Sequence, residues 1–343
     1  MPGLTLPPRL SPRWTADIDD HVIAAGWSHD GQLVAAAAVS GPVLILDAGT
    51  GEVRHRLSGH GFGTADLAWH PSKPMLATAG QDGKARLWDA ASGTCSAELA
   101  GGAAWVEHVA WSSDGQYLAT AAGKKLRLWD AAGTLVREYP DHPSTIADLA
   151  WRAGGDDLAS AAYGGVQVWG PASDTPRLTL DWKGSILALA WSPDGKLMAH
   201  GNQDATVHFW YVRSRSDLQM HGYPIKVRQV AFDTTSRYLA TGGSEQITVW
   251  DCSGKKGPEG SKPINLTAHE DVISALAYQR TGPFLASGGE DGAVILWQPG
   301  KFKKPQAAAR PAAPSAVTRL AWSPDDRRLL AGTASGAVVV YAT

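Results

Sequence analysis

The chain has 343 residues, of which 44% are hydrophobic, and this is enough apolar material to build a large folded core. Its 31 basic and 33 acidic residues give a formal net charge of −2, which argues against a protein that coats nucleic acid with a broad cationic surface. The two cysteines, Cys95 and Cys252, lie far apart, so neither a disulfide framework nor a Cys-x-x-Cys metal site is available. A run of roughly 18 apolar residues, long enough to cross a membrane, does not occur. We expect a cytoplasmic protein that does not bind membranes.

The N-terminal part of the chain copies a later segment. Residues 1–11 are expected to form an N-terminal extension. From residue 12, the segment PRWTADIDDHVIAAGWS parallels PRLTLDWKGSILALAWS at residues 176–192 almost position by position. Residues 12–17 are therefore predicted to form a strand of the kind that precedes a repeated unit.

One short phrase, a small or aliphatic pair followed by an aromatic residue, recurs every 40 to 46 residues and accounts for most of the 15 tryptophans. We call its aromatic residues the first-strand anchors: Trp27, Trp69, Trp111, Trp151, Trp191, Phe232, Tyr278 and Trp322. A second anchor follows each of them after 18 or 19 residues: Leu46, Trp88, Trp129, Trp169, Trp210, Trp250, Trp297 and Tyr341. The chain is therefore built from eight copies of one unit.

Each unit contains stretches of strand length separated by turns. In the second unit, TADLAW alternates with period two, and MLATAG and KARLWD are further strands divided by the turn residues QDG. A more polar stretch, EVRHRL at residues 52–57, precedes the unit as a fourth strand. Four strands with a period of 40 to 46 residues are typical of a β-propeller blade.

The repeated motifs resemble those of the WD-repeat family over residues 12–343. They are LWD at 87–89 and 128–130, VWD at 249–251, SHDG at 28–31, SSDG at 112–115 and SPDG at 192–195. The resemblance implies an all-β, closed propeller of four-stranded antiparallel blades. Eight units predict eight blades, with seven, the commoner number in the family, as the alternative. The strand at 12–17 would join the last three strands and close the ring, which removes exposed sheet edges.

The family's polar network of His, Ser or Thr, Asp and Trp is complete in two units: His60, Thr78, Asp82 and Trp88 in the second, and His269, Ser287, Asp291 and Trp297 in the seventh. The fourth unit keeps only His142, Ser160 and Trp169. In the fifth, Trp182 takes the His position and His200 the Ser/Thr position, with Asp204 and Trp210 unchanged. The first and eighth units lack the polar members. We therefore expect fraying to begin at blades one and eight.

Catalytic motifs are absent from the sequence. It contains no GxSxG, HExxH or GxxxxGK[ST] segment, and we expect neither enzymatic activity nor a cofactor. Eleven histidines raise the question of a metal. The repeat accounts for His60, His142 and His269, and in the fifth unit we expect a His200–Asp204 hydrogen bond and a solvent-facing His208. Spacing assembles no metal site.

The family resemblance implies an interaction platform whose partner is a protein or peptide, held by a ring that is monomeric by itself. The loops before each first strand and between the second and third strands would share one rim, the top face. Exposed aromatic residues with polar neighbours are typical of protein-binding hot spots. The residues predicted to bind a partner there are Trp105, Tyr163, Trp182, Lys183, Gln203, Lys226, Glu245 and Glu290.

Two long connections, at residues 252–263 and 298–315, should lie on the opposite, bottom face. They contribute a basic patch of Lys255, Lys256, Lys262, Lys301, Lys303, Lys304 and Arg310. A solvated linker is one interpretation, and docking of an acidic partner or a phosphate-bearing polymer is the other. A second alternative to protein binding is a small-molecule or metal-responsive module that uses the central channel or the region of His200. A nucleic-acid partner is not expected, because aromatic residues for base stacking are almost absent from these loops.

Overall fold

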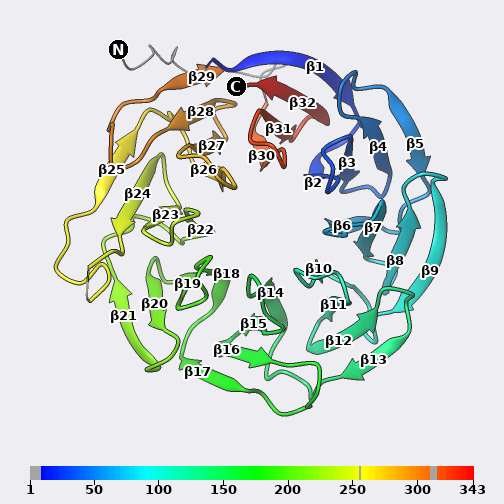
Figure 1. Ribbon diagram of the computed structural model, residues 1–343, viewed down its shortest axis with the longest axis horizontal. Coiled ribbons are helices and arrows are strands. Elements are labelled where there is room, and N and C mark those ends of the chain that lie inside the picture. The colour runs from blue at the N-terminus through cyan, green and yellow to red at the C-terminus, as the bar shows by residue number, and fades with distance from the viewer. Residues whose placement is uncertain (1–8, 255, 310–314) are drawn as a thin grey trace.

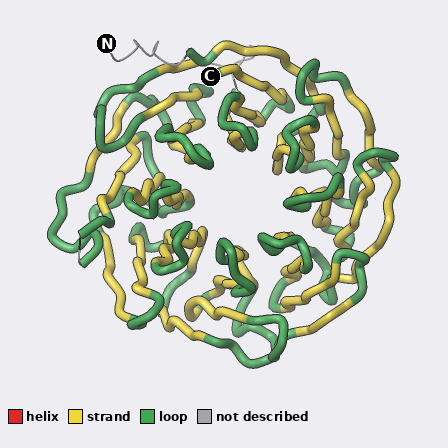
Figure 2. Tube along the Cα trace, viewed as in Figure 1, coloured by secondary structure: helices red, strands yellow, loops and turns green. Residues whose placement is uncertain are grey.

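The protein is an all-β ring around a central channel. The computed structural model describes residues 9–254, 256–309 and 315–343, and these residues form 32 strands and no helix. Figure 1 shows the strands arranged as blades around the channel, and Figure 2 shows that only strands and loops alternate along the trace. The strands group into eight antiparallel sheets of four, so eight blades are confirmed and the seven-blade alternative is wrong.

The first four blades follow one another along the chain. Blade 1 consists of β2 (Val22–Trp27), β3 (Leu33–Ala38), β4 (Val43–Asp47) and β5 (Val53–Leu57). Blade 2 consists of β6 (Thr64–Trp69), β7 (Met75–Gly80), β8 (Lys84–Asp89) and β9 (Thr94–Ala100). Blade 3 consists of β10 (His108–Trp111), β11 (Tyr117–Ala122), β12 (Lys125–Asp130) and β13 (Leu135–Glu138). Blade 4 consists of β14 (Ile146–Trp151), β15 (Leu158–Ala162), β16 (Gly164–Trp169) and β17 (Leu178–Trp182).

The remaining blades complete the circle. Blade 5 consists of β18 (Ile186–Trp191), β19 (Leu197–Asn202), β20 (Val207–Tyr211) and β21 (Ser216–Met220). Blade 6 consists of β22 (Gln229–Phe232), β23 (Tyr238–Gly242), β24 (Gln246–Asp251) and β25 (Ile264–Thr267). Blade 7 consists of β26 (Ile273–Tyr278), β27 (Leu285–Gly289), β28 (Val294–Trp297) and β29 (Ala307–Ala309). Blade 8 combines β30 (Val317–Trp322), β31 (Arg328–Thr333) and β32 (Ala337–Ala342) with β1 (Ser11–Asp17).

The ring closes without a covalent link, as the sequence predicted. Strand β1 pairs antiparallel with β32, and Trp14 of β1 lies opposite Val340. The Trp14 indole also donates a hydrogen bond of 3.0 Å to the carbonyl of Ala48 in blade 1. Arg328 of blade 8 donates to the carbonyls of Ala48 and Gly31 and lies over the Trp27 ring. The closing junction is therefore fastened by side chains as well as by strand pairing.

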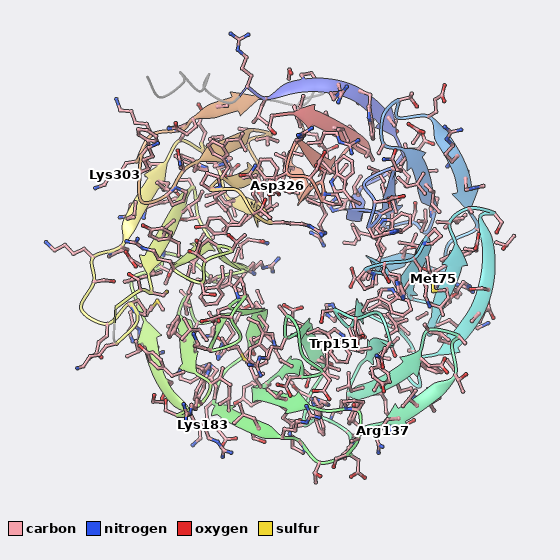
Figure 3. The ribbon with its side chains drawn as sticks, in the orientation of Figure 1. Met75, Arg137, Trp151, Lys183, Lys303 and Asp326 are labelled. Atoms are coloured by element: carbon pink, nitrogen blue, oxygen red, sulfur yellow. The ribbon has the colours of Figure 1, made fainter. Side chains whose placement is uncertain are left out.

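The turn between the first and second strands explains why the Ser-x-Asp-Gly motif recurs. In blade 1, the Ser28 hydroxyl donates to Asp30 and accepts from the amide of Leu33, and Gly31 has a φ of 70°, which favours glycine. In blade 8, Asp326 takes the glycine place with a φ of 58°. Its carboxylate accepts hydrogen bonds from the amides of Arg280, Thr281 and Gly282 of blade 7 (Figure 3). This departure from the motif thus joins two blades.

The first-strand anchors fasten each blade to the one before it. Within the described residues, six anchor indoles donate to a backbone carbonyl of the preceding first strand at 2.9 to 3.2 Å: Trp27 to Ala321, Trp69 to Gly26, Trp111 to Ala68, Trp151 to Ala110, Trp191 to Ala150 and Trp322 to Ala277. Phe232 has no donor, and the buried Tyr278 hydroxyl has no partner among the described residues. Blade 6 is therefore joined on both sides without an indole hydrogen bond.

Candidate interaction surfaces

The polar networks expected in blades 2 and 7 are hydrogen-bonded inside the blades. In blade 2, the Thr78 hydroxyl accepts from the Trp88 indole at 2.9 Å and lies 2.8 Å from Nε2 of His60, whose Nδ1 lies 2.9 Å from Asp82. Burial lowers the pKa of His60, so the imidazole is neutral at pH 7. In blade 7, Ser287, His269, Asp291 and Trp297 repeat this arrangement. These groups hold strands together and do not face a ligand.

Blade 5 replaces this network with a stack of aromatic rings. The rings of His200 and His208 are 5.3 Å apart and nearly parallel, and Trp182 packs on His208 at 4.0 Å. The prediction that His208 faces solvent is wrong, because its exposure is 2% and its Nε2 bonds Asp217. The expected partner of His200 was also wrong: Nδ1 contacts Asn202 at 2.8 Å, whereas Asp204 accepts from the Thr206 hydroxyl.

The hydrogen bonds of His200 bear on the metal alternative. The Trp210 indole donates to Nε2, so Nε2 is the acceptor nitrogen and Nδ1 carries the proton that is donated to Asn202. Both ring nitrogens are therefore occupied. No group of three or more His, Cys, Asp or Glu side chains suited to a metal ion occurs in the part of the chain that the structure describes. The region of His200 thus gives a metal-responsive function no support.

The top face carries a row of exposed aromatic side chains on three consecutive blades. Trp105, in the loop before β10, is 54% exposed, and Tyr163, between β15 and β16, is 57% exposed. Phe62, in the loop before β6, is 88% exposed and was not among the residues predicted for this face. We call Phe62, Trp105 and Tyr163 the aromatic row. Trp182 does not extend it, because the structure places that ring against His208 and its Nε1 is buried.

The charged residues predicted for the top face do not form one patch. Lys183, Gln203, Glu245 and Glu290 are exposed on blades 4 to 7, and Figure 3 shows Lys183 at the outer edge of the ring. Lys226 and Glu290 line a cavity of about 520 Å³ that is enclosed by the top loops of blades 6, 7 and 8. This cavity also contains two arginines that the sequence analysis missed, Arg228 and Arg319. We call it the top pocket.

The inner end of the top pocket opens into the central channel, where Arg228 and Arg319 line a second cavity together with Asp66 and Asp148. The two carboxylates accept hydrogen bonds from the next blade: Asp66 from the amide of Val109 and Asp148 from the amide of Leu189. Burial raises the pKa of both carboxyls. Arg319 and Asp66 occupy the same place in their repeats, three residues before the anchor, so an alignment of the eight units could have revealed this ring of channel side chains.

The bottom loops present a scattered set of lysines. Lys256 forms an ion pair of 3.7 Å with Glu259, and Lys301 lies over the ring of Phe302. Lys262, Lys303 and Lys304 are exposed, and Figure 3 shows Lys303 at the outer edge of the ring. Lys255 and Arg310 lie outside the described residues. The cavities on this face are lined mainly by turn residues of blades 5 to 7, and the lysines do not contribute to them.

These features define a closed, eight-bladed propeller whose polar side chains mostly serve the blades. The sequence profile of the WD domain, G-beta repeat family matches residues 51–89, 93–130, 175–211, 214–251, 260–298 and 310–341, more than half of the chain. The chain therefore belongs to the WD-repeat family. The two units outside these matches, the first and the fourth, are among those with an incomplete polar network.

Relatives share parts of the ring. The chain is 38% identical over 72 residues to the chromatin assembly factor 1 subunit FAS2 homolog of Oryza sativa subsp. japonica, covering 20% of this chain and 14% of that protein. It is 26% identical over 153 residues to protein groucho of Drosophila melanogaster, covering 43% of this chain and 19% of that protein. The matched segments are thus less than a fifth of either relative.

The fold has a close counterpart among solved structures. The crystal structure of the computationally designed Ika8 protein superimposes with a TM-score of 0.82 over 98% of this chain and 99% of that one. The two sequences are 20% identical, so the likeness concerns the fold alone. No helix that could span a membrane is found among the residues described.

Proposed function

We propose that this protein is a non-catalytic scaffold that binds a protein or peptide partner on its top face. The observation that carries the proposal is the aromatic row, in which Phe62, Trp105 and Tyr163 are each more than half exposed on neighbouring blades. Large aromatic side chains left in water cost free energy that a partner recovers by covering them, which is why such residues dominate interface energetics. The WD-repeat relatives support an interaction role in general terms.

The loops that carry the aromatic row are held in place by the fold. The amide of Ile146 donates to the carbonyl of Gly123, and the amide of Tyr163 donates to the Ser144 hydroxyl, so the top loops of blades 3 and 4 are bonded to each other. A partner would therefore meet preorganised side chains and lose little affinity in ordering them.

The proposal is tested by affinity capture from the native cell with the protein immobilised. The double variant Trp105→Ala, Tyr163→Ala should lose about 30-fold or more in affinity for the captured partner, because a hot-spot aromatic contributes about 2 kcal/mol. Phe302→Ala is the matched control, since Phe302 is 43% exposed on a bottom loop. Equal capture by the double variant and the control would show that the aromatic row is not the binding surface.

A further inference from the structure

The top pocket gathers basic side chains that lack acidic partners. Lys226 and Arg228 come from the connection between β21 and β22, and Arg319 comes from β30. Within the described residues, none of the three forms an ion pair. The acid among the described lining residues is Glu290. The top pocket itself therefore holds three basic side chains and one acid, and the acids nearest to its arginines, Asp66, Glu107 and Asp148, lie in the adjoining channel cavity.

The two arginines are accessible to an anion that enters the top pocket. Arg319 projects from β30 where the top pocket meets the central channel; desolvation lowers its pKa, and the charge of Asp66 acts in the opposite direction. Both arginines are exposed and neither forms an ion pair among the described residues, so an incoming anion does not compete with a bound carboxylate. Guanidinium groups also match a carboxylate with two parallel hydrogen bonds.

The other polar groups of the pocket limit what kind of anion fits. The Ser274 hydroxyl donates to the carbonyl of Val317, and the Thr318 hydroxyl donates to the carbonyl of Val22, so both already serve contacts between blades. The Gln229 amide has no hydrogen-bond partner among the described residues and remains available beside Arg228. A ligand would thus be held by guanidinium, ammonium and amide groups and not by a cradle of hydroxyls.

Apolar side chains line the outer part of the same pocket. Ile225 is 41% exposed at its edge, and Val272 and Ala316 lie beside it. An inorganic anion or a free phosphate makes no use of this surface. A peptide makes use of both parts, because its aliphatic side chains can cover Ile225 while its carboxylates reach the arginines.

We infer that the top pocket binds an acidic peptide segment, whose carboxylates pair with Arg228 and Arg319 while an apolar neighbour covers Ile225. This inference rests on the proposed function, since it names the chemistry of a partner held on the same face. It adds a second contact area on blades 6 to 8, across the channel mouth from the aromatic row on blades 2 to 4. Charge complementarity, three cations against one acid among the lining residues, selects the occupant.

The test is a selection from a randomised peptide library with the purified full chain, followed by anisotropy measurements on the enriched peptides. We expect enrichment of Asp and Glu beside an aliphatic residue. The variant Arg228→Gln, Arg319→Gln should weaken these peptides by about 100-fold, about tenfold for each lost charged contact. The control Arg56→Gln, Arg213→Gln removes the same charge from exposed arginines outside the pocket and should change affinity less than about threefold.

Three outcomes would overturn the inference. The selection would show no acidic enrichment, the two double variants would lose affinity equally, or inorganic phosphate would displace the peptides at concentrations at which a control anion displaces none of them. A labelled single-stranded oligonucleotide that binds the pocket more tightly than the peptides would also replace this occupant. The variant Trp105→Ala, Tyr163→Ala separates the two proposals. If this variant abolishes partner capture but leaves the acidic selection intact, the aromatic row binds the partner independently of the top pocket. If only the arginine variant reduces partner capture, the partner-binding surface is the top pocket and not the aromatic row.

Discussion

Blade 6 should be the first part of the ring to open, because both of its junctions lack the indole hydrogen bond. Phe232 and Tyr278 stand where the other six junctions have a tryptophan. One net hydrogen bond is worth about 1 kcal/mol, so the free energy of opening blade 6 should be about 2 kcal/mol lower than that of a blade fastened on both sides. This corresponds to about 30-fold less protection from hydrogen exchange.

The comparison blade is blade 4, where Trp151 donates to blade 3 and Trp191 of blade 5 donates back to blade 4. Native-state hydrogen exchange read by mass spectrometry should show faster exchange in β22 and β23 than in β14 and β15. The substitution Trp151→Phe, at the inner side of blade 4 in Figure 3, removes one bond and should lower the protection of blade 4 about fivefold, toward that of blade 6.

Two results would refute this reasoning. Protection in β22 and β23 equal to that in β14 and β15 would show that the indole bonds do not control opening. An unchanged exchange rate in blade 4 of Trp151→Phe would show the same. The reasoning also replaces the sequence-based expectation that blades 1 and 8 fray first. Arg328, Trp14 and Trp27 all bond across the closing junction, and that expectation considered only the missing polar network.

Two further predictions concern the buried polar groups. Burial lowers the pKa of His142 to about 4 and that of His200 to about 3, whereas both side chains titrate near 6.5 in the unfolded chain. Their contribution to stability is therefore complete above about pH 6.5. It is lost as the pH falls, because the unfolded chain takes up protons that the folded chain does not. At pH 5 the two histidines together should lower the free energy of unfolding, measured with urea, by about 4 kcal/mol relative to neutral pH. His142→Gln should remove about half of this pH dependence, and an unchanged dependence would contradict its assignment to these histidines. In blade 2, Thr78→Val leaves the Trp88 indole without its acceptor and Nε2 of His60 without its hydroxyl partner, and it should lower the free energy of unfolding by about 3 kcal/mol. Thr241→Val in blade 6 is the comparison: Thr241 bonds the Tyr223 hydroxyl, which itself accepts from the Trp250 indole, so the indole keeps its acceptor and the loss should be smaller. Equal losses would argue against the network in blade 2.

The architecture could be predicted from the sequence because each blade repeats the same physical solution. An aromatic anchor every 40 to 46 residues and a turn motif between strands specify strand positions, and eight such units leave one way to close the ring. The parallel between the segment at residue 12 and that at residue 176 identified the closing strand before its partner was known.

Side-chain exposure was harder to predict, and His208 shows why. Alternation along a strand predicts exposure only when one face of a sheet meets water, whereas the inner strands of a blade are covered on both faces by neighbouring blades. His208 on β20 is therefore enclosed by Trp182 from blade 4 and by Asp217 on β21. For the same reason Trp182 packs against His208 and is not part of the exposed surface of the top face.

The two parts of the top face differ in how the fold supports them. The aromatic row lies on blades 2 to 4, whose junctions all carry an indole hydrogen bond, and it meets a partner as a rigid surface. The top pocket spans blades 6 to 8, where the junction of blades 6 and 7 has Tyr278 at the anchor and no indole hydrogen bond, whereas Trp322 joins blade 8 to blade 7. A ligand that bridges Arg228 and Arg319 contacts both blades that flank blade 7 and binds only the closed ring. Its binding free energy therefore adds to the stability of the closed ring, including the junction of blades 6 and 7 that lacks tryptophan, since any ligand specific for the folded state stabilises it.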